Sequence, residues 1–293
     1  MTPDRLAPYA RLPRAYHDDL RLLHSTVDAF GRAHWLLRTP DEAPGPYDAV
    51  VVTVDGGASY ATALSSVTAR HPKVDSLPDG GFVVADARSG TGDEQVQVFD
   101  ALGRPTWTFR VGDAIKHLLT DEAGDLWIGY FDEGVFGDDP LSAAGARRWS
   151  ATGEALWAYS PPPGADGIAD CYALNVDRKV AWVYPFTPYA GFPLVEVRHD
   201  RPLHLRTTPV EGASGVAVHG ERVVFFGGYR KDRDRLVVAS LDETTVDVVT
   251  TTRLTRADGT PPDGRRRVVS RGPRIYVQEP SGTEWGVLDV GRG

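Results

Sequence analysis

A short pattern of polar turn and apolar strand recurs along the chain. Each copy joins a turn rich in Gly, Asp or Lys to a run of β-branched and aromatic residues, as in PDGGFVVAD (Pro78 to Asp86) and DEAGDLWIGY (Asp121 to Tyr130). Four further copies begin at Asp28, Val176, His219 and Ser270. The copies follow one another at roughly 40 to 55 residues, the period of four-stranded propeller blades. The pattern predicts an all-β chain folded as a six-bladed β-propeller with four-stranded antiparallel blades.

Two hairpins at matching positions support this repeat. Val98 to Trp107 and Trp149 to Trp157 each place a turn of the type D-x-x-G or S-x-x-G between two β-rich runs. Gly103 and Gly153 supply the residue with positive φ that such turns need. We therefore interpret residues 1–293 as one propeller domain, with blades at about 18–70, 71–111, 112–163, 164–210, 211–254 and 255–293.

The N-terminal residues are predicted to complete the last blade. Glu284 to Val290 (EWGVLDV) is typical of a third strand, and no fourth strand follows it. Residues 1–17 carry Tyr9, Leu12 and Tyr16, which suit an outer strand better than the alternative, a disordered tail. A strand from the opposite terminus would leave only short, protected sheet edges. Helices are expected to be nearly absent.

Composition narrows the classes of partner. The net charge of −8 disfavours binding to nucleic acid or anionic lipid. No apolar stretch approaches the roughly 18 residues of a membrane span, and the N-terminus lacks the apolar region of a signal peptide. Cys171 is the single cysteine, so no intrachain disulfide can form. With the strong preference for Arg over Lys, these features favour a soluble, cytoplasmic bacterial protein.

Loop lengths indicate which face carries a site. Turns between first and second strands have about four residues, whereas the other face carries long loops such as RSGTGDE, FDEGVFGDDPLSAAGA, FTPYAGFP and GGYRKDRDR. Long loops on a rigid scaffold are where binding and catalysis usually occur. We expect the site on this loop-rich face.

Polar residues at the starts of the innermost strands are expected near the propeller axis. They are His24, Lys73, Asp75, Lys116, His117, Asp170, Cys171, Tyr172, Ser214 and Arg265 to Arg267. In one interpretation His117 and His24 act as general base or metal ligand beside Asp75 and Asp170. In the alternative interpretation, a water-filled channel simply tolerates polar side chains.

The densest polar cluster is the segment Tyr130 to Asp139. Asp132 and Glu133 lie between aromatic residues, including Phe131, and two glycines flank Val135 and Phe136. Such carboxylates could bind a cation, or burial could raise the pKa of Glu133 for proton transfer. The alternative is a solvated acidic turn whose aromatic residues cover the blade.

Three other features have two interpretations each. Cys171 could be a nucleophile, although a buried and inert thiol is favoured because no cationic helix terminus is in view to lower its pKa and the neighbouring carboxylate of Asp170 would raise it. Pro185 to Pro193 (PFTPYAGFP) is either a lid or partner surface or a loop packed on its neighbour. Arg230, beside Tyr229, either meets an anionic ligand group or belongs to a solvated loop.

The Asp-x-x-Gly turns, with VQVFDALGR and LWIGYFDEGVFG, resemble six-bladed propellers of the NHL and gluconolactonase-like type. LWIGYFDEGVFG and DCYALNV also look like an actinobacterial group of propeller-like proteins without an assigned activity. Gluconolactonase-like enzymes hold a divalent cation in the channel with Glu, Asn and Asp from separate blades. Here the inner strands offer His, Asp and Arg instead, so the resemblance implies no recognisable metal ligand set, and no cofactor is predicted.

The sequence leaves three hypotheses of function. The first is a propeller that binds a small molecule or peptide on its loop-rich face, with ligand contacts from His24, Tyr130, Phe131, Asp132, Tyr172 and Arg230. The second is an acid/base hydrolase, lyase or isomerase of specialised metabolism, whose catalytic groups are His117, Glu133, Asp75 and Asp170. The third is a protein-interaction scaffold that uses residues 185–193.

Overall fold

The protein is built almost entirely from β-strands. The computed structural model describes residues 4–17, 19–40, 45–90, 92–262, 264 and 266–291. Within these ranges the helical elements are a four-residue helix, α1 (Asp132–Val135), and the 3₁₀ turns η1 (Arg14–Tyr16) and η2 (Arg230–Asp232). The expected scarcity of helix is confirmed. None of the helical elements in these ranges is long and apolar enough to cross a membrane.

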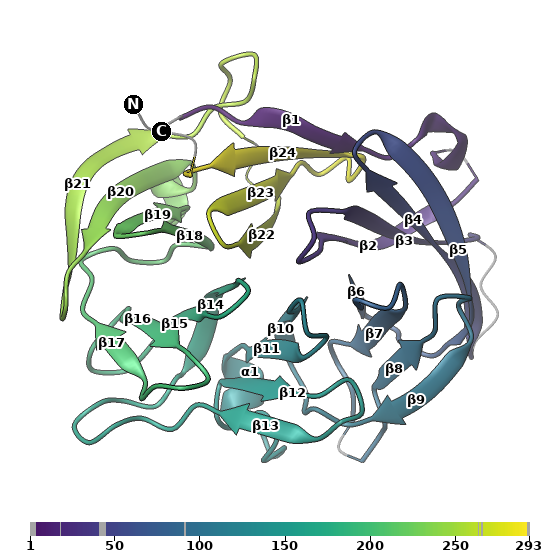
Figure 1. The fold of residues 1–293 in the computed structure, drawn as a ribbon, viewed down its shortest axis with the longest axis horizontal. Helices are drawn as coiled ribbons and strands as arrows, with labels where there is room; N and C mark the ends of the chain where they lie inside the picture. Colours follow the sequence, from purple (N-terminus) through teal and green to yellow (C-terminus); the bar gives the residue numbers. More distant parts are fainter. Residues whose placement is uncertain are drawn as a thin grey trace. The chain divides into compact units, whose positions relative to one another are not determined.

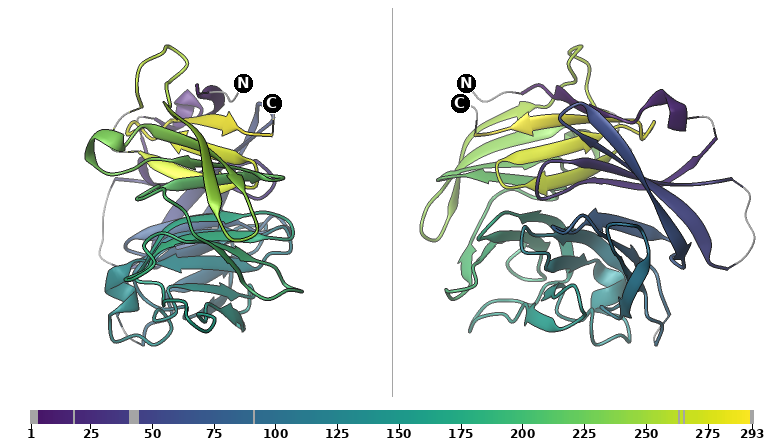
Figure 2. Two further views of the ribbon diagram at one scale, coloured as in Figure 1. Left: turned by 90° about the vertical axis from the view of Figure 1, so that its left-hand side faces the viewer. Right: turned by 45° about the vertical axis from the view of Figure 1, so that its right-hand side comes forward.

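The chain divides into two compact units. We call residues 10–159 the N-terminal unit, and residues 1–9 together with 160–293 the C-terminal unit. In both units the sheets twist from strand to strand (Figure 2), as antiparallel sheets of L-residues do.

The N-terminal unit contains three four-stranded antiparallel sheets, each formed by consecutive strands (Figure 1). The first contains β2 (Arg21–Val27), β3 (Ala33–Arg38), β4 (Tyr47–Asp55) and β5 (Ala58–Val67). The second contains β6 (Pro72–Ser76), β7 (Phe82–Asp86), β8 (Val96–Phe99) and β9 (Pro105–Phe109). The third contains β10 (Ile115–Thr120), β11 (Leu126–Tyr130), β12 (Ala146–Trp149) and β13 (Ala155–Ala158).

The C-terminal unit repeats this plan with one addition. A four-stranded sheet contains β18 (Gly215–His219), β19 (Arg222–Phe226), β20 (Arg235–Leu241) and β21 (Val246–Arg253). A second sheet has the strand order β1-β24-β23-β22-β14-β15-β16-β17. Its strands are β14 (Asp170–Val176), β15 (Ala181–Phe186), β16 (Leu194–Val197), β17 (His204–Arg206), β22 (Arg267–Arg271), β23 (Arg274–Gln278), β24 (Glu284–Asp289) and β1 (Ala7–Arg11). The parallel pairing of β14 with β22 consists of the single pair Asn175 and Ser270, so this sheet consists of two four-stranded halves.

The N-terminal strand joins the sheet formed by the last strands of the chain. β1 is the neighbour of β24, Leu6 is buried, and the ring of Tyr9 packs 4.8 Å from that of Tyr276. A side chain at Gly286 would lie only 3.2 Å from Cβ of Leu6, so the absence of one lets the two strands approach. The expectation that the N-terminal residues supply the fourth strand of this sheet is confirmed.

The apolar core lies between the faces of successive sheets within each unit. In the N-terminal unit, Val83, Ile128 and Trp149 belong to a cluster shared by the second and third sheets. In the C-terminal unit, Trp182 and Phe225 belong to a cluster shared by the β14–β17 half and the β18–β21 sheet. Alternating apolar side chains on both faces of each strand make this packing possible.

Candidate functional site

The D-x-x-G turns at one end of the N-terminal unit are built by a shared hydrogen-bond pattern. Oδ1 of Asp28 accepts hydrogen bonds from the backbone N–H groups of Phe30 (2.9 Å) and Arg32 (2.8 Å). Asp100 and Asp121 accept from the residues two and four positions later in the same way. The glycine three residues after each aspartate has φ between 74° and 93°, a conformation in which a Cβ is strained.

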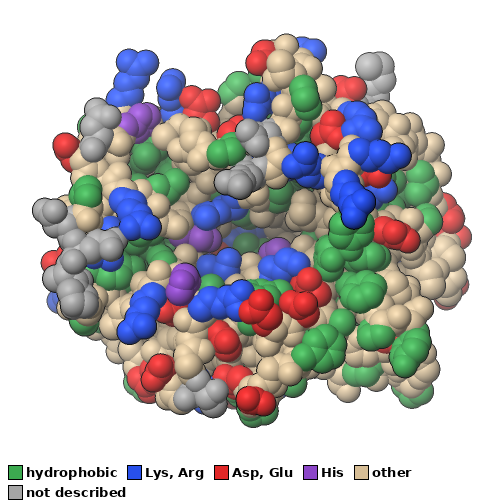
Figure 3. Space-filling model, turned by 180° about the vertical axis from the view of Figure 1, so that it is seen from behind, with side chains coloured by type: hydrophobic (Ala, Val, Ile, Leu, Met, Phe, Trp, Pro, Cys, Tyr) green, Lys and Arg blue, Asp and Glu red, His purple; other side chains and the backbone are tan. Residues whose placement is uncertain are grey.

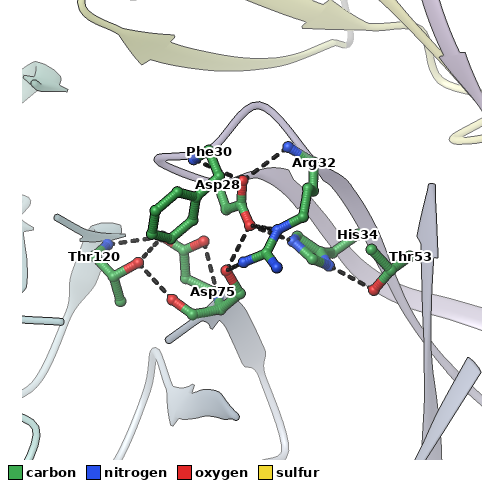
Figure 4. A network of polar contacts seen from close by, with 8 residues as sticks. Asp28, Phe30, Arg32, His34, Thr53, Asp75 and Thr120 are labelled. Atoms are coloured by element: carbon green, nitrogen blue, oxygen red, sulfur yellow. Dashed lines mark hydrogen bonds and ion pairs between the residues drawn. The ribbon is translucent and has the colours of Figure 1, made fainter. Parts of the chain in front are cut away.

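Around Asp28 this turn grows into a buried network (Figure 4). Oδ2 of Asp28 accepts from Nε2 of His34 (2.9 Å), from Nε of Arg32 (2.7 Å) and from the hydroxyl of Ser76 on β6 (2.6 Å). The other ring nitrogen of His34 lies 2.8 Å from the hydroxyl of Thr53. Burial alone would raise the pKa of Asp28, but His34, Ser76 and Arg32 outweigh it and lower this pKa below its ordinary value. The network links two sheets, and sequence reasoning did not anticipate it.

The side chain of Asp75, predicted as a catalytic group, forms hydrogen bonds to strand β10 of the neighbouring sheet. Its side chain is fully buried. Oδ2 accepts from the backbone N–H of Thr120 (2.7 Å) and from its hydroxyl (3.2 Å), and Oδ1 accepts from the N–H of Ser76 (3.0 Å). These bonds tie β6 to β10 (Figure 4), and they occupy the oxygens that proton transfer would use.

The predicted acidic cluster places Glu133 in an ion pair at the surface. Glu133 lies in the first turn of the short helix α1, and its carboxylate accepts from Nη1 of Arg88. The Arg88 guanidinium also stacks over the ring of Phe131 at 4.1 Å. The hydrogen bond from Arg88 lowers the pKa of Glu133, so the expected raised pKa is wrong: the side chain is exposed and paired with a cation rather than enclosed by apolar groups.

Two other members of this segment differ in their surroundings. Tyr130 is fully buried, and its hydroxyl donates to the backbone carbonyl of Val111. Burial raises the pKa of Tyr130. Asp132 is exposed and accepts from the N–H of Glu133 at 2.9 Å. Of the residues predicted here, Phe131, Asp132 and Glu133 are thus accessible to a ligand, and Tyr130 belongs to the core.

The innermost strands carry the predicted histidines beside β-bulges. The pairing registers of β2, β10 and β14 each shift by one residue near their starts, at Leu23, Lys116 and Tyr172. Bulges re-aim side chains and are frequent near functional sites. His24 and His117 follow two of these bulges and are half-buried, and Nδ1 of His24 accepts from the N–H of Val74 at 3.2 Å.

The remaining predicted positions lie mainly on β14. Asp170 is half-buried there, opposite Phe186 of β15. Cys171 is fully buried, and its thiol lies 3.7 Å from the carbonyl of Ala173, in agreement with the inert-thiol interpretation. Among the described residues, no group of three or more His, Cys, Asp or Glu side chains could hold a metal ion.

Some positions that the sequence analysis used lie outside the described residues. They are residues 1–3 of the N-terminal segment, Asp18, residues 41–44 and 91 of two predicted loops, Arg265, and residues 263, 292 and 293.

In the C-terminal unit the structure gathers aromatic side chains around the loop after β15. We call this group the aromatic surface, and it consists of Tyr172, Phe186, Tyr189, Phe192 and Tyr229. Phe192 is its buried centre, with ring centroids 4.9 Å from Tyr172, 5.3 Å from Phe186 and 6.4 Å from Tyr229. The hydroxyl of Tyr229 donates to that of Tyr172 at 2.7 Å. Sequence reasoning singled out Tyr172 and the loop, but not their meeting with Tyr229.

The loop that carries Tyr189 is held in place by the protein itself. Thr187 and Gly191 exchange backbone hydrogen bonds of 2.7 and 3.2 Å. Oδ2 of Asp166 accepts from the N–H groups of Tyr189 (3.0 Å) and Ala190 (2.8 Å). Tyr189 is nevertheless 92% exposed at the tip. A large aromatic side chain therefore projects from a fixed backbone.

Arg230 extends this surface with an unusual backbone. Its φ is 48°, a left-handed conformation that costs a bulky residue free energy and is retained mainly at functional sites. The preceding Tyr229 packs against Gly212, where an added Cβ would lie 2.6 Å from the ring.

Acidic and basic side chains are interspersed over the face of the molecule drawn in Figure 3.

No family model and no curated protein matches the sequence. Among solved structures, the chain is similar to the Pan2 WD40 domain of Neurospora crassa, with a TM-score of 0.52 and 9% identity over 100% of this chain and 98% of that one. It is also similar to the β-propeller domain of the trilobed protease of Pyrococcus furiosus (TM-score 0.44, 12% identity, 93% and 96% covered). A third similar structure is the GH93 α-L-arabinofuranosidase of Fusarium graminearum (TM-score 0.47, 11% identity, 98% of both chains). With its consecutive four-stranded antiparallel sheets, the chain has the all-β fold of a β-propeller.

Proposed function

We propose that this protein is a β-propeller that binds a peptide segment of a partner through the aromatic surface of its C-terminal unit. The observation that carries the proposal is Tyr189, which is 92% exposed although its loop is fixed by Asp166. Burying such a ring in a complex would stabilise the complex, because apolar surface is removed from water. Little backbone entropy would be lost on binding, because the backbone of the loop is already ordered.

The composition of the surface favours a peptide over a small molecule. Tyrosine and phenylalanine dominate it, and Tyr is enriched at protein interfaces because it combines a large apolar area with a polar end. Phe186 and Tyr229, whose rings both pack near that of Phe192, are 37% and 50% exposed. Exposed aromatic side chains are what proline-rich peptides contact in several peptide-binding domains.

The acid/base hypothesis receives less support from the candidate groups. Glu133 has a lowered pKa because of Arg88, and Asp75 is buried with its oxygens bonded to Thr120 and Ser76. A general acid at neutral pH needs a raised pKa and access to substrate. His117 and Asp170 remain candidates for the acid/base alternative.

Selection from a random peptide library displayed on phage tests the proposal. We expect the immobilised protein to enrich a shared motif, and Tyr189→Ala and Tyr229→Ala to weaken the selected peptide at least tenfold, the usual effect of losing an aromatic hot spot. Tyr60→Ala is the matched control, because Tyr60 is 48% exposed on β5 of the other unit. Absence of any enriched motif, or equal losses in the Tyr60 and Tyr189 variants, would contradict the proposal.

A further inference from the structure

A positively charged loop adjoins the aromatic surface in the C-terminal unit. It connects β19 to β20, and we call residues 227–234 the basic loop. Tyr229 of the aromatic surface belongs to it, and the next residue, Arg230, begins the 3₁₀ turn η2. Arg230 and Lys231 are exposed, and no hydrogen bond or ion pair joins either side chain to another residue that the structure describes. Two consecutive positive charges are therefore available beside the aromatic surface.

Three other arginine side chains hold the basic loop through its backbone carbonyl groups. Nε of Arg233 donates to the carbonyl of Arg230 at 3.0 Å. Nη1 of Arg253, at the end of β21, donates to the carbonyl of Lys231 at 2.9 Å. Arg266, just before β22, donates to the carbonyl of Arg233. A carbonyl oxygen accepts a guanidinium proton but carries no net charge, so these contacts order the loop and leave its positive charge in place.

Carboxylates balance only part of this charge. Asp232 and Asp234 lie in the basic loop, and both pair with Arg253. Arg235, the first residue of β20, donates to the backbone carbonyl of Glu211. Against these three acidic residues stand six cationic ones: Arg230, Lys231, Arg233, Arg235, Arg253 and Arg266. The whole chain has a net charge of −8, so the basic loop is a local region of opposite sign.

The basic loop and the aromatic surface have a common support. An added Cβ at Gly212 would lie 2.6 Å from the ring of Tyr229, and the preceding residue, Glu211, accepts the hydrogen bond from Arg235. Consecutive Cα atoms are about 3.8 Å apart, so a peptide that lies on Tyr229 passes Arg230 within about two residues of its own length. One short peptide can therefore contact both features.

We propose that the peptide bound by the aromatic surface is acidic, and that its Asp or Glu carboxylates pair with Arg230 and Lys231. This inference rests on the proposed function, because the aromatic surface supplies the apolar part of the same site. Guanidinium groups bind carboxylates through two parallel N–H bonds, and clustered arginines recognise acidic motifs in this way. A nucleic acid fits less well, because the net charge of −8 repels a long polyanion, whereas a short acidic segment meets only the basic loop.

Three peptide libraries displayed on phage test this inference. Each peptide contains a random apolar segment flanked by fixed residues, which are all Glu, all Gln or all Lys. We expect the Glu library to be enriched most. Replacing Glu by Gln in a selected peptide should weaken its binding about tenfold, the combined effect of several exposed ion pairs. Raising the salt concentration from about 0.05 M to about 0.5 M should also weaken it, because salt screens exposed charges.

Charge reversal tests the protein side of the contact. We expect the double variant Arg230→Glu/Lys231→Glu to bind a selected acidic peptide at least tenfold more weakly than wild type. Arg178→Glu/Lys179→Glu is the matched control, because it reverses an exposed Arg-Lys pair in the turn between β14 and β15 of the same unit. The control changes the net charge equally and should bind like wild type. Because all four side chains are exposed, both variants should keep the circular dichroism spectrum of the wild type.

The outcomes separate this inference from the proposed function. Binding that requires Tyr189 but is equal for Glu and Gln peptides, or equal for the two reversed variants, would overturn the acidic partner and leave the proposed function intact. Binding lost in Arg230→Glu/Lys231→Glu but kept in Tyr189→Ala would overturn the proposed function, and the combined site with it. Binding only of peptides that carry phosphoserine would overturn the assignment to carboxylates. Enrichment from none of the libraries would contradict both proposals.

Discussion

Asp28 and Asp121 begin two turns of the same design in the N-terminal unit, and they use their second carboxylate oxygen differently. Oδ1 of each binds the N–H groups two and four residues later. Oδ2 of each then accepts from the residue six positions later, which is His34 in the first case (2.9 Å) and Trp127 in the second (3.1 Å). The backbone of the turn is the same, and the side chain presented by the second strand differs.

The difference determines what each carboxylate connects. Asp28 also binds Ser76 of the next sheet, so it joins two sheets through a buried network. Asp121 lies 3.5 Å from Arg148 of its own sheet, which also pairs with Asp125. A repeated turn can therefore be a local element in one blade and a contact between sheets in another.

The largest expected effect comes from Asp28→Ala. Removing one partner of a buried, charged network leaves His34 and Arg32 without their acceptor, which typically costs about 3–5 kcal/mol of unfolding free energy. Chemical denaturation with urea measures this cost. A loss below about 1 kcal/mol would mean that Asp28 does no more than shape its turn.

Asp121→Ala should have a smaller effect. The change removes the acceptor of Trp127 and of two backbone N–H groups, at a cost of about 1–3 kcal/mol for partly unsatisfied donors. Arg148 keeps Asp125 as a partner, which limits the loss. The same urea titration makes the test, and a larger loss than for Asp28→Ala would reverse the comparison.

Acid should remove the stability that Asp28 contributes. The pKa of Asp28 is lowered in the folded protein relative to about 3.9 in an unfolded chain. Its contribution to stability is therefore complete above about pH 4 and is lost as the pH falls through the folded-state value. We expect the difference in unfolding free energy between wild type and Asp28→Asn to shrink as the pH falls below about 4. A difference that is constant from pH 7 to pH 3 would contradict this.

The smallest effect is expected for Asp100→Ala. Asp100 builds the same turn between β8 and β9, but its side chain is partly exposed and pairs with the exposed Arg104. Water replaces such contacts readily, so the melting temperature should change by no more than about 1–2 °C. A shift as large as that of Asp121→Ala would show that the turn itself, rather than burial, controls the stability.

The repeat and the outer strand at the N-terminus were predictable because both are local patterns. The Asp-x-x-Gly turns, the paired hairpins and the apolar residues near Tyr9 are visible in single segments of sequence. Trp127 and Trp182 are 4% exposed, in keeping with their predicted strands. These signals depend on strand periodicity and turn chemistry alone.

The candidate site was less predictable because its contacts join distant segments. Asp75 lies two residues farther into β6 than the half-buried Lys73, and that step places it beside Thr120. Arg88 lies in the loop after β7 and Glu133 in helix α1, 45 residues later, so the lowered pKa of Glu133 could not be inferred from its neighbours in sequence. Trp107 is 52% exposed, and this was not predicted, because it depends on the place of this residue on an outer strand. The sequence predicted which residues form strands, but it did not predict how deeply each side chain is buried.

The pairing of β1 with β24 has a consequence for biosynthesis. At translation rates of about 5–20 residues per second, the ribosome releases β1 roughly 15–60 seconds before it completes β24. During that interval β1 is an unpaired strand that other chains could capture. The sheet that it completes can form only after β24 has been synthesised, and contacts between segments so far apart in sequence form slowly. The fold therefore makes the pairing of β1 with β24 a late step in the formation of this sheet.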